Sequence, residues 1–225
     1  MIKIQETSKD KLRLNFITDM STNLANAIRR SVLEIPIMAI DEIDIVKNDS
    51  ALYDEMLAHR IGLVPIKTEK GVKETKFKLV EKGPKTVYSS DIKPSIGTDY
   101  KIPLVILDNE QEVEMVCDAR FGKGVDHIKY SPGLVYFKHN IDPEVLDFVY
   151  IDEEGKVSYD EEEMDVKKLK EEDKNKIKKL KDVNELIFSI ESWGQIPAKD
   201  IFLRAIEALD ENLEELNKEV KYSEK

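Results

Sequence analysis

The N-terminal part of the chain carries a helical pattern of small and apolar residues. These side chains recur three and four residues apart over residues 21–32, which is the spacing of one helix face. Ser21 or Thr22 can accept a hydrogen bond from the free amides of the first turn, so either is a candidate N-cap. Pro36 cannot continue a helix, and the predicted helix therefore ends before it. Its predicted buried face consists of Leu24, Ala27, Ile28, Ser31 and Val32.

A strand and a second helix follow in the pattern. Apolar and acidic residues partly alternate over residues 39–46, which predicts a strand with one face in water. Asn48, Asp49 and Ser50 offer N-caps for a second helix. That helix would end at Gly62, in the left-handed conformation that glycine favours after a helix, so Gly62 has a predicted structural role. The apolar residues of this helix are Leu52, Met56, Leu57 and Ile61.

Polar and charged side chains flank both apolar faces. Asn26, Arg29 and Arg30 project away from the buried face of the first helix. Two adjacent arginines beside small packing residues indicate a helix that packs closely against another surface and presents charge beside it, while solvated surface arginines explain the same pattern. His59 and Arg60 fall in the last turn of the second helix, where cations interact favourably with the carbonyl end of the helix dipole. We therefore expect both to have a structural role.

Alternation with a period of two predicts further strands. Residues 2–17 form a predicted hairpin, which we expect to pair with the strand over 39–46 beneath the first helix. Cys117 lies on the apolar face of a later strand and is interpreted as a small buried core residue. The predicted strands in the middle of the chain cover residues 77–80, 86–89, 102–107 and 113–121.

Two features after these strands could suggest a ligand site. Gly122-Lys123-Gly124 is too short for a phosphate-binding loop and lacks the strand–helix setting of one. His127 stands alone in the loop that leads to Pro132, with no second or third metal ligand nearby. We expect His127 to be a structural, hydrogen-bonding residue, and we predict no metal site.

The C-terminal part contains a charged block and then a long amphipathic helix. Residues 152–182 are dense in Glu, Asp and Lys, which indicates an exposed helix or a solvated linker. A strand is predicted over 186–190, and Pro197 suits the first turn of the following helix. This helix could lie on its own sheet, on a partner, or on both in its two halves. Its coiled-coil-like seam is Phe202, Ile206, Leu209, Leu213, Leu216 and Val220.

Length and charge limit the class of protein. The 225 residues can bury one good-sized core or two small ones. The net charge of −11 argues against broad nucleic-acid binding, which needs a basic surface. No apolar run is long enough to span a bilayer or to serve as the core of a signal peptide, so we expect a cytoplasmic protein with no membrane contact. A single cysteine excludes an internal disulfide and any multi-cysteine metal site.

Two dense motifs carry a resemblance to a known family. The first motif is Asn-Ala-Ile-Arg-Arg at residues 26–30, and the second is Leu-Ala-His-Arg-Ile-Gly-Leu-Val-Pro-Ile at residues 57–66. Together they resemble the alpha-type assembly subunits of cellular RNA polymerases, and more narrowly the archaeal D subunits. A looser similarity extends through residues 122–132 and the C-terminal helix.

The resemblance implies an α+β fold in which one domain is split by an insertion. Residues 1–47 and 183–225 would form the assembly domain, an antiparallel sheet with two helices. Residues 48–138 would be an inserted, mostly β domain. Residues 139–182 would be a charged insert, the reduced remnant of a ferredoxin-like domain. In some relatives that domain holds an iron–sulfur cluster, but its cysteines are missing here, so we expect no cluster and no other cofactor.

The same resemblance implies a function without catalysis. The subunit would pair with a small alpha-like subunit and dock the second-largest polymerase subunit, with small zinc-binding subunits nearby and no direct contact with nucleic acid. Asn26, Arg29 and Arg30 would face the second-largest subunit. The residues implied in subunit pairing are Phe202, Ile206, Leu209, Leu213 and Leu216.

Two other classes of function compete with this one. An enzyme would have to use His59, His127 and His139, but no paired spacing, nucleophile motif or phosphate loop supports such a site. A free-standing acidic adaptor would use the charged block at 152–182 as its binding segment, although a charge run is usually a solvated face.

Overall fold

The computed structural model describes residues 2–69, 71, 73–141, 146, 148–153, 157–159 and 185–223. Its first half contains β1 (Ile2–Thr7), β2 (Arg13–Thr18), α1 (Thr22–Ser31), η1 (Val32–Glu34), β3 (Ile37–Asn48), α2 (Asp54–Gly62), β4 (Thr75–Lys82), β5 (Lys85–Tyr88), η2 (Ser89–Asp91) and β6 (Pro103–Leu107). Its second half contains β7 (Glu112–Gly122), η3 (Ile128–Tyr130), β8 (Gly133–His139), β9 (Val149–Ile151), β10 (Val157–Tyr159), β11 (Leu186–Ser192) and α5 (Ala198–Ser223).

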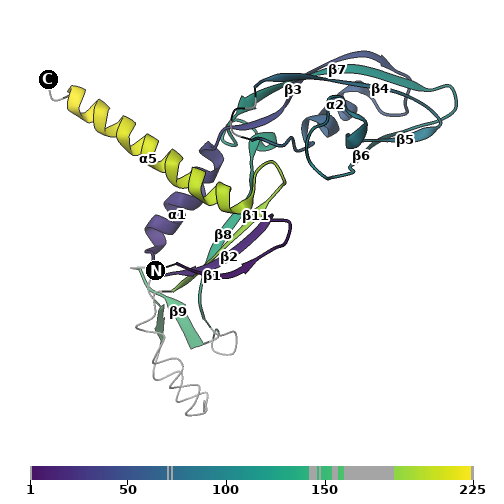
Figure 1. Cartoon of the computed structure of the whole chain (residues 1–225). Coiled ribbons are helices and arrows are strands. Elements are labelled where there is room, and N and C mark those ends of the chain that lie inside the picture. The colour runs from purple at the N-terminus through teal and green to yellow at the C-terminus, as the bar shows by residue number, and fades with distance from the viewer. Residues whose placement is uncertain are drawn as a thin grey trace.

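The strands form two main antiparallel sheets (Figure 1). The first sheet has the order β1-β2-β11-β8, and the second has the order β3-β7-β4, with the ribbon β5-β6 beside it. Helices α1 and α5 cross over the first sheet, while α2 lies within the module of the second sheet. The α+β class and the antiparallel sheets are as predicted.

The first core lies between the first sheet and the helix pair. It is centred on aromatic side chains, with the ring centroids of Phe16 and Phe188 5.3 Å apart and Phe202 edge-on to Phe16 at 5.0 Å. Phe137 stacks on the other side of Phe188 at 6.0 Å. Such aromatic pairs add to the free energy of burial. The strand β2, the strand β11 and the first turns of α5 are therefore joined by one aromatic cluster.

Helix α1 begins as predicted but buries a slightly different face. The hydroxyl of Ser21 accepts a hydrogen bond from the amide of Leu24, so Ser21 is the N-cap. Ala25, Ile28 and Ser31 are buried, whereas Leu24 is exposed. The expectation for Leu24 was wrong because α5 crosses α1 and covers the side of the helix that bears Ala25.

The predicted ends of α2 were also wrong. Tyr53 stands at the N-cap without a side-chain hydrogen bond, and Asn48 instead bonds to the Leu52 carbonyl and the Asp54 carboxylate within the preceding loop. Gly62 is the last helical residue and is not left-handed, since the chain continues through Leu63 in a right-handed conformation. The structure therefore gives Gly62 no left-handed capping role.

The long strand β3 pairs differently from the expectation. It bonds to β7 in the second sheet, whereas the N-terminal hairpin bonds through β2 to β11. The later strand β8 returns to the first sheet, where it also pairs with β11. Alternation along a strand shows which face is wet but not which strand lies beside it. The chain thus changes sheet before residue 37 and after residue 122.

The second core packs the inner faces of the second sheet, α2 and the β5-β6 ribbon. Cys117 is fully buried there between its neighbours on β7, as predicted. Burial, with a smaller effect from the adjacent Asp118, raises the pKa of the Cys117 thiol to about 12. This cysteine is therefore a core residue and not a reactive thiol.

An ion-pair network attaches the segment after β7 to β3. Asp41 sits where the β3–β7 register shifts, and such a bulge redirects a side chain. Its carboxylate accepts hydrogen bonds from Lys129 at 2.6 Å and from the hydroxyl of Tyr130 at 3.0 Å, with Arg120 3.6 Å away. The Lys129 bond, helped by that of Tyr130, lowers the pKa of Asp41 despite partial burial. The network holds η3 firmly against the second sheet.

Only a small part of the charged block lies within the described residues. The strands β9 and β10 pair in antiparallel orientation. Residues 154–156 and 160–184 lie outside the described residues. The expected remnant of a ferredoxin-like domain stays a prediction.

Replacing Phe188 with Ala should destabilise the chain by about 3–5 kcal/mol, because it empties the centre of the aromatic cluster. Urea unfolding followed by tryptophan fluorescence would measure this change. As a control, Ile106→Ala on the exposed side of β6, where the side chain is 72% exposed, should change the free energy of unfolding by no more than about 0.5 kcal/mol. Equal effects of the two substitutions would contradict the position assigned to Phe188.

The Asp41 network should make stability depend on pH below about 4. Because the pKa of Asp41 is lowered by folding, its contribution is fully present at neutral pH and is lost as pH falls through the unfolded and then the folded pKa. The variant Asp41→Asn should therefore be less stable than the native chain at pH 7 and lose less stability on acidification. Urea midpoints at pH 7 and about pH 3 give the comparison. Parallel losses in both proteins would show that Asp41 does not contribute.

Candidate partner-binding surfaces

The two arginines of the first motif differ in how they are held. The guanidinium of Arg29 donates from Nε and Nη2 to the Oδ1 of Asn26, at 3.2 and 2.8 Å. The side chain of Arg30 is exposed and forms no hydrogen bond or ion pair with any residue that the structure describes. Arg29 is thus oriented in advance, whereas Arg30 is free to meet a partner. The structure brings all three predicted residues to one side of α1.

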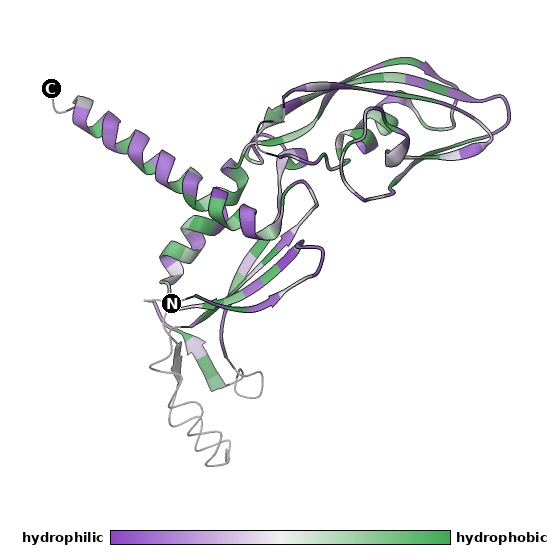
Figure 2. Ribbon diagram, viewed as in Figure 1, coloured by the Kyte–Doolittle hydropathy of each residue, from purple (hydrophilic) through white to green (hydrophobic). Residues whose placement is uncertain are grey.

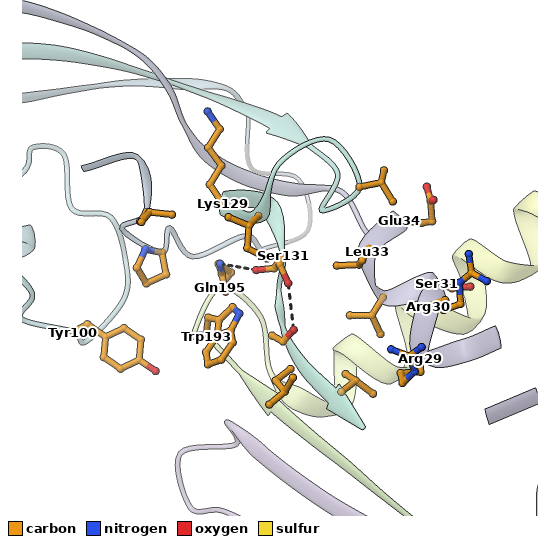
Figure 3. Close-up of a pocket in the computed structure, with 18 of the residues that line it drawn as sticks. Arg29, Arg30, Ser31, Leu33, Glu34, Tyr100, Lys129, Ser131, Trp193 and Gln195 are labelled. Carbon is orange, nitrogen blue, oxygen red and sulfur yellow. Dashed lines mark hydrogen bonds between the residues drawn. The ribbon is translucent and has the colours of Figure 1, made fainter. Parts of the chain in front are cut away.

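The two sequence motifs meet at a single hollow of about 920 Å³. Arg29 and Arg30 reach it from α1, and Leu63 and Pro65 reach it from the second motif. In Figure 3 the arginines lie on one side and Tyr100 on the other, with Trp193 and Gln195 between them. We call this hollow the two-motif groove. Its other principal lining residues are Leu33, Val125, Ile128, Lys129 and Leu134.

Close backbone approach explains the glycines at the groove. A Cβ on Gly122 would lie 2.5 Å from the ring of Tyr130, and one on Gly124 would lie 2.8 Å from a methyl group of Leu33. The amide of Val125 also donates to the Leu33 carbonyl at 3.3 Å. The glycines thus let residues 122–131 pack against η1. Their role is in packing, which the short glycine motif alone did not reveal.

Several groove residues were missed by sequence reasoning. Leu33, Val125, Ile128, Leu134 and Trp193 are apolar yet exposed at the groove. They come from separate segments, and no periodic pattern links them. The one available signal was the glycine pair at 122 and 124, which marks a loop pressed closely against a neighbour.

Two of the residues with predicted structural roles, Arg60 and His127, each form a hydrogen bond with a backbone group. The guanidinium of Arg60 donates from Nη2 to the carbonyl of Pro103 at 2.8 Å, which ties α2 to β6. The Nδ1 of His127 accepts a hydrogen bond from the amide of Lys129 at 3.1 Å and caps η3. His59 is exposed, and it lines a small hollow of about 240 Å³ together with His127.

The three histidines do not meet in one site. His139 lies at the end of β8 in the first sheet and pairs with Leu186, away from the hollow that His59 and His127 share. Burial lowers the pKa of His139. Among the residues that the structure describes, no group of three or more His, Cys, Asp or Glu side chains could hold a metal ion.

The seam of α5 divides into a buried half and an exposed half. Phe202 is only 9% exposed within the first core, and Leu209 is partly buried against it. Farther along, Leu213 and Leu216 are 55% and 56% exposed, and Val220 is also exposed. We call Ile206, Leu213 and Leu216 the α5 ridge.

Figure 2 shows green positions alternating with purple ones along the part of α5 that extends beyond the sheet. The first half of α5 packs on its own sheet, which is one of the arrangements that the sequence left open, and pairing through the second half stays a prediction. None of the described helices has the length and apolar character of a membrane span.

Comparison with known proteins gives a consistent result. The family described as the RNA polymerase Rpb3/Rpb11 dimerisation domain matches residues 8–213. The chain is 30% identical to the DNA-directed RNA polymerase subunit Rpo3 of Thermococcus kodakarensis, over 96% of this chain and 97% of that protein. It is 39% identical to the subunit of the same name from Methanocaldococcus jannaschii, over 66% of this chain and 82% of that protein.

A third relative extends the match over nearly the whole chain. The Rpo3 subunit of Methanobrevibacter smithii is 30% identical over 99% of this chain and 98% of its own length. The family predicted from the two motifs is therefore confirmed, and the chain belongs to the RNA polymerase Rpb3/Rpb11 dimerisation-domain family.

Proposed function

We propose that this chain is a non-catalytic assembly subunit of an archaeal DNA-directed RNA polymerase. It pairs with a small alpha-like subunit and docks the second-largest subunit, with small zinc-binding subunits nearby. The observation that carries this proposal is the α5 ridge, an apolar seam that continues past the sheet that buries its first half. The names of the relatives and the description of the matching domain support the same assignment.

The α5 ridge supports pairing with a partner of like fold. Exposed leucines at 213 and 216 leave apolar area in water, and their burial is favourable by roughly 25 cal/mol per Å². A partner with the same helix pair can cover them with its own ridge, as two related surfaces do in a pseudo-symmetric dimer. Phe202 and Leu209 contribute indirectly, because they hold the first half of the helix on its own core.

The arginine side of α1 supports docking of a larger partner. Arg29 is oriented by Asn26, so less side-chain freedom is lost when its planar group binds a carboxylate. Arg30 adds a second cation whose charge is not matched within the described chain. A bidentate contact to a carboxylate gives orientation as well as free energy. We assign this surface to the second-largest polymerase subunit.

We further propose that the subunit holds no iron–sulfur cluster and works in the cytoplasm. The single cysteine, Cys117, lies in the second core and cannot supply the thiolate ligands of a cluster. Anaerobically purified protein should therefore lack the charge-transfer absorption of a cluster. We also retain as a proposal the division into a split assembly domain, an inserted domain and a charged insert.

Replacing Leu213 and Leu216 with Asp should abolish pairing with the small alpha-like subunit, because both side chains are exposed and their loss leaves the first core intact. Co-expression followed by size-exclusion chromatography measures the heterodimer. Lys218→Asp is a matched control, because it changes the net charge by the same amount as the double substitution. Lys218 lies about 160° around the helix from Phe202, away from the apolar seam. A heterodimer that survives the double substitution would rule out the α5 ridge as the pairing surface.

Replacing Arg29 and Arg30 with Lys should weaken binding of the second-largest subunit by about tenfold or more, because lysine keeps the charge but loses the planar, bidentate contact. Binding to the immobilised heterodimer measures the effect. Arg13→Lys on β2, where the Arg13 side chain forms an exposed ion pair with Glu191, should leave binding unchanged. If both sets of variants bind like the native chain, the arginine side of α1 is not the docking surface.

A further inference from the structure

The two-motif groove gathers exposed apolar side chains from separate parts of the chain. Val125 and Ile128 come from the segment between β7 and β8, Leu134 from β8, and Trp193 from the turn after β11. Ile128 is 66% exposed and Trp193 is 45% exposed. Large apolar side chains that cluster at a hollow indicate a binding site more strongly than single exposed residues do.

These side chains are held rigidly. Lys123 pairs with Glu34 at 3.1 Å, and Lys129 pairs with Asp41 at 2.6 Å, so both ends of the segment that carries Val125 and Ile128 are fixed. The amide of Trp193 donates to the Pro132 carbonyl at 3.0 Å, which fixes the opposite wall. A surface that is ordered before binding loses little conformational entropy when a partner arrives. The apolar exposure is therefore built into the fold.

Charge at the groove selects the chemistry of the partner. Lys123 and Lys129 are already neutralised by Glu34 and Asp41. Among the described residues, the guanidinium groups of Arg29 and Arg30 are charges at the rim that form no ion pair. This local positive charge lies on a chain with a net charge of −11. A complementary segment therefore combines a large apolar side chain with at least one carboxylate.

We propose that the two-motif groove receives an acidic, apolar segment of the second-largest polymerase subunit, with Ile128 and Trp193 as the apolar anchors and Arg30 as the carboxylate contact. This inference rests on the proposed function and deepens it. The groove is continuous with the arginine side of α1, so the partner that meets the arginines also reaches the hollow. A volume of about 920 Å³ accommodates several side chains, which favours a segment over a single residue.

The test uses the full chain, co-expressed with the small alpha-like subunit, and purified second-largest subunit as the probe. Ile128→Asp and Trp193→Ala should each weaken binding by about 30-fold, the effect of losing an anchor residue at an interface. Ile106→Asp, on the exposed side of β6 outside the groove, should leave binding unchanged. Heterodimer formation with the small subunit shows that each variant has folded.

A matched pair of substitutions tests the charge of the partner segment. Ile128→Lys and Ile128→Asp remove the same apolar anchor and differ in sign of charge. An acidic segment should bind the Lys variant at least fivefold more tightly than the Asp variant, and this difference should shrink at high salt. Equal binding of the two variants, or tighter binding of the Asp variant, would overturn the assignment of an acidic segment.

The outcomes separate this inference from the proposed function. If the Ile128 and Trp193 variants bind like the native chain while the arginine variants are weakened, the groove is not part of the interface and the proposed docking stands. If the native heterodimer does not bind the second-largest subunit, the proposed function itself fails. If the variants lose only the small zinc-binding subunits, the occupant named here is wrong. If Ile106→Asp weakens binding as much, the effect is not specific to the groove, and the inference fails.

Discussion

The apolar seam of α5 is longer than the sheet that can bury it. Phe202 and the neighbouring small residues fill the core over the first sheet, where they pack on Phe16 and Phe188. The same helix face continues to Leu213 and Leu216, where more than half of each side chain stays exposed among the described residues. The packing of the first core does not require this ridge, because polar residues at positions 213 and 216 would leave that core unchanged. The ridge therefore fits the proposed pairing surface rather than a need of the first core.

A second consequence comes from the way the chain passes between the two sheets. It leaves the first sheet through η1 and returns through residues 122–133, so these two connections lie against each other. Glycines at 122 and 124 permit that close contact, and Asp41 secures it by binding Lys129 and Tyr130. Burial and the Asp41 hydrogen bond raise the pKa of Tyr130 to about 12, so its hydroxyl stays a donor at neutral pH. The two connections therefore form a rigid unit, and the two-motif groove lies on its outer surface.

Features that depend on neighbours in the sequence were predicted, and features that depend on distant segments were not. The start of α1 at Ser21 or Thr22, the strands near 77–121 and the presence of a long C-terminal helix were predicted correctly, because each depends on residues close in sequence. The partner of β3, the exposed position of Leu24 and the conformation of Gly62 were not. The first two depend on which distant segment packs nearby. A period-two pattern fits either neighbouring strand, and a helix face can be covered from more than one side.

The sequence by itself determined the family, through the two motifs, and the presence of an apolar seam along α5. Only the tertiary structure decided that the two motifs share one groove, and that Val125, Ile128 and Trp193 line it with them. The physical reason is that the residues of a helical seam recur at a regular spacing in consecutive turns of the helix. A surface assembled across two connections has no period, and its residues become neighbours only when both sheets have formed.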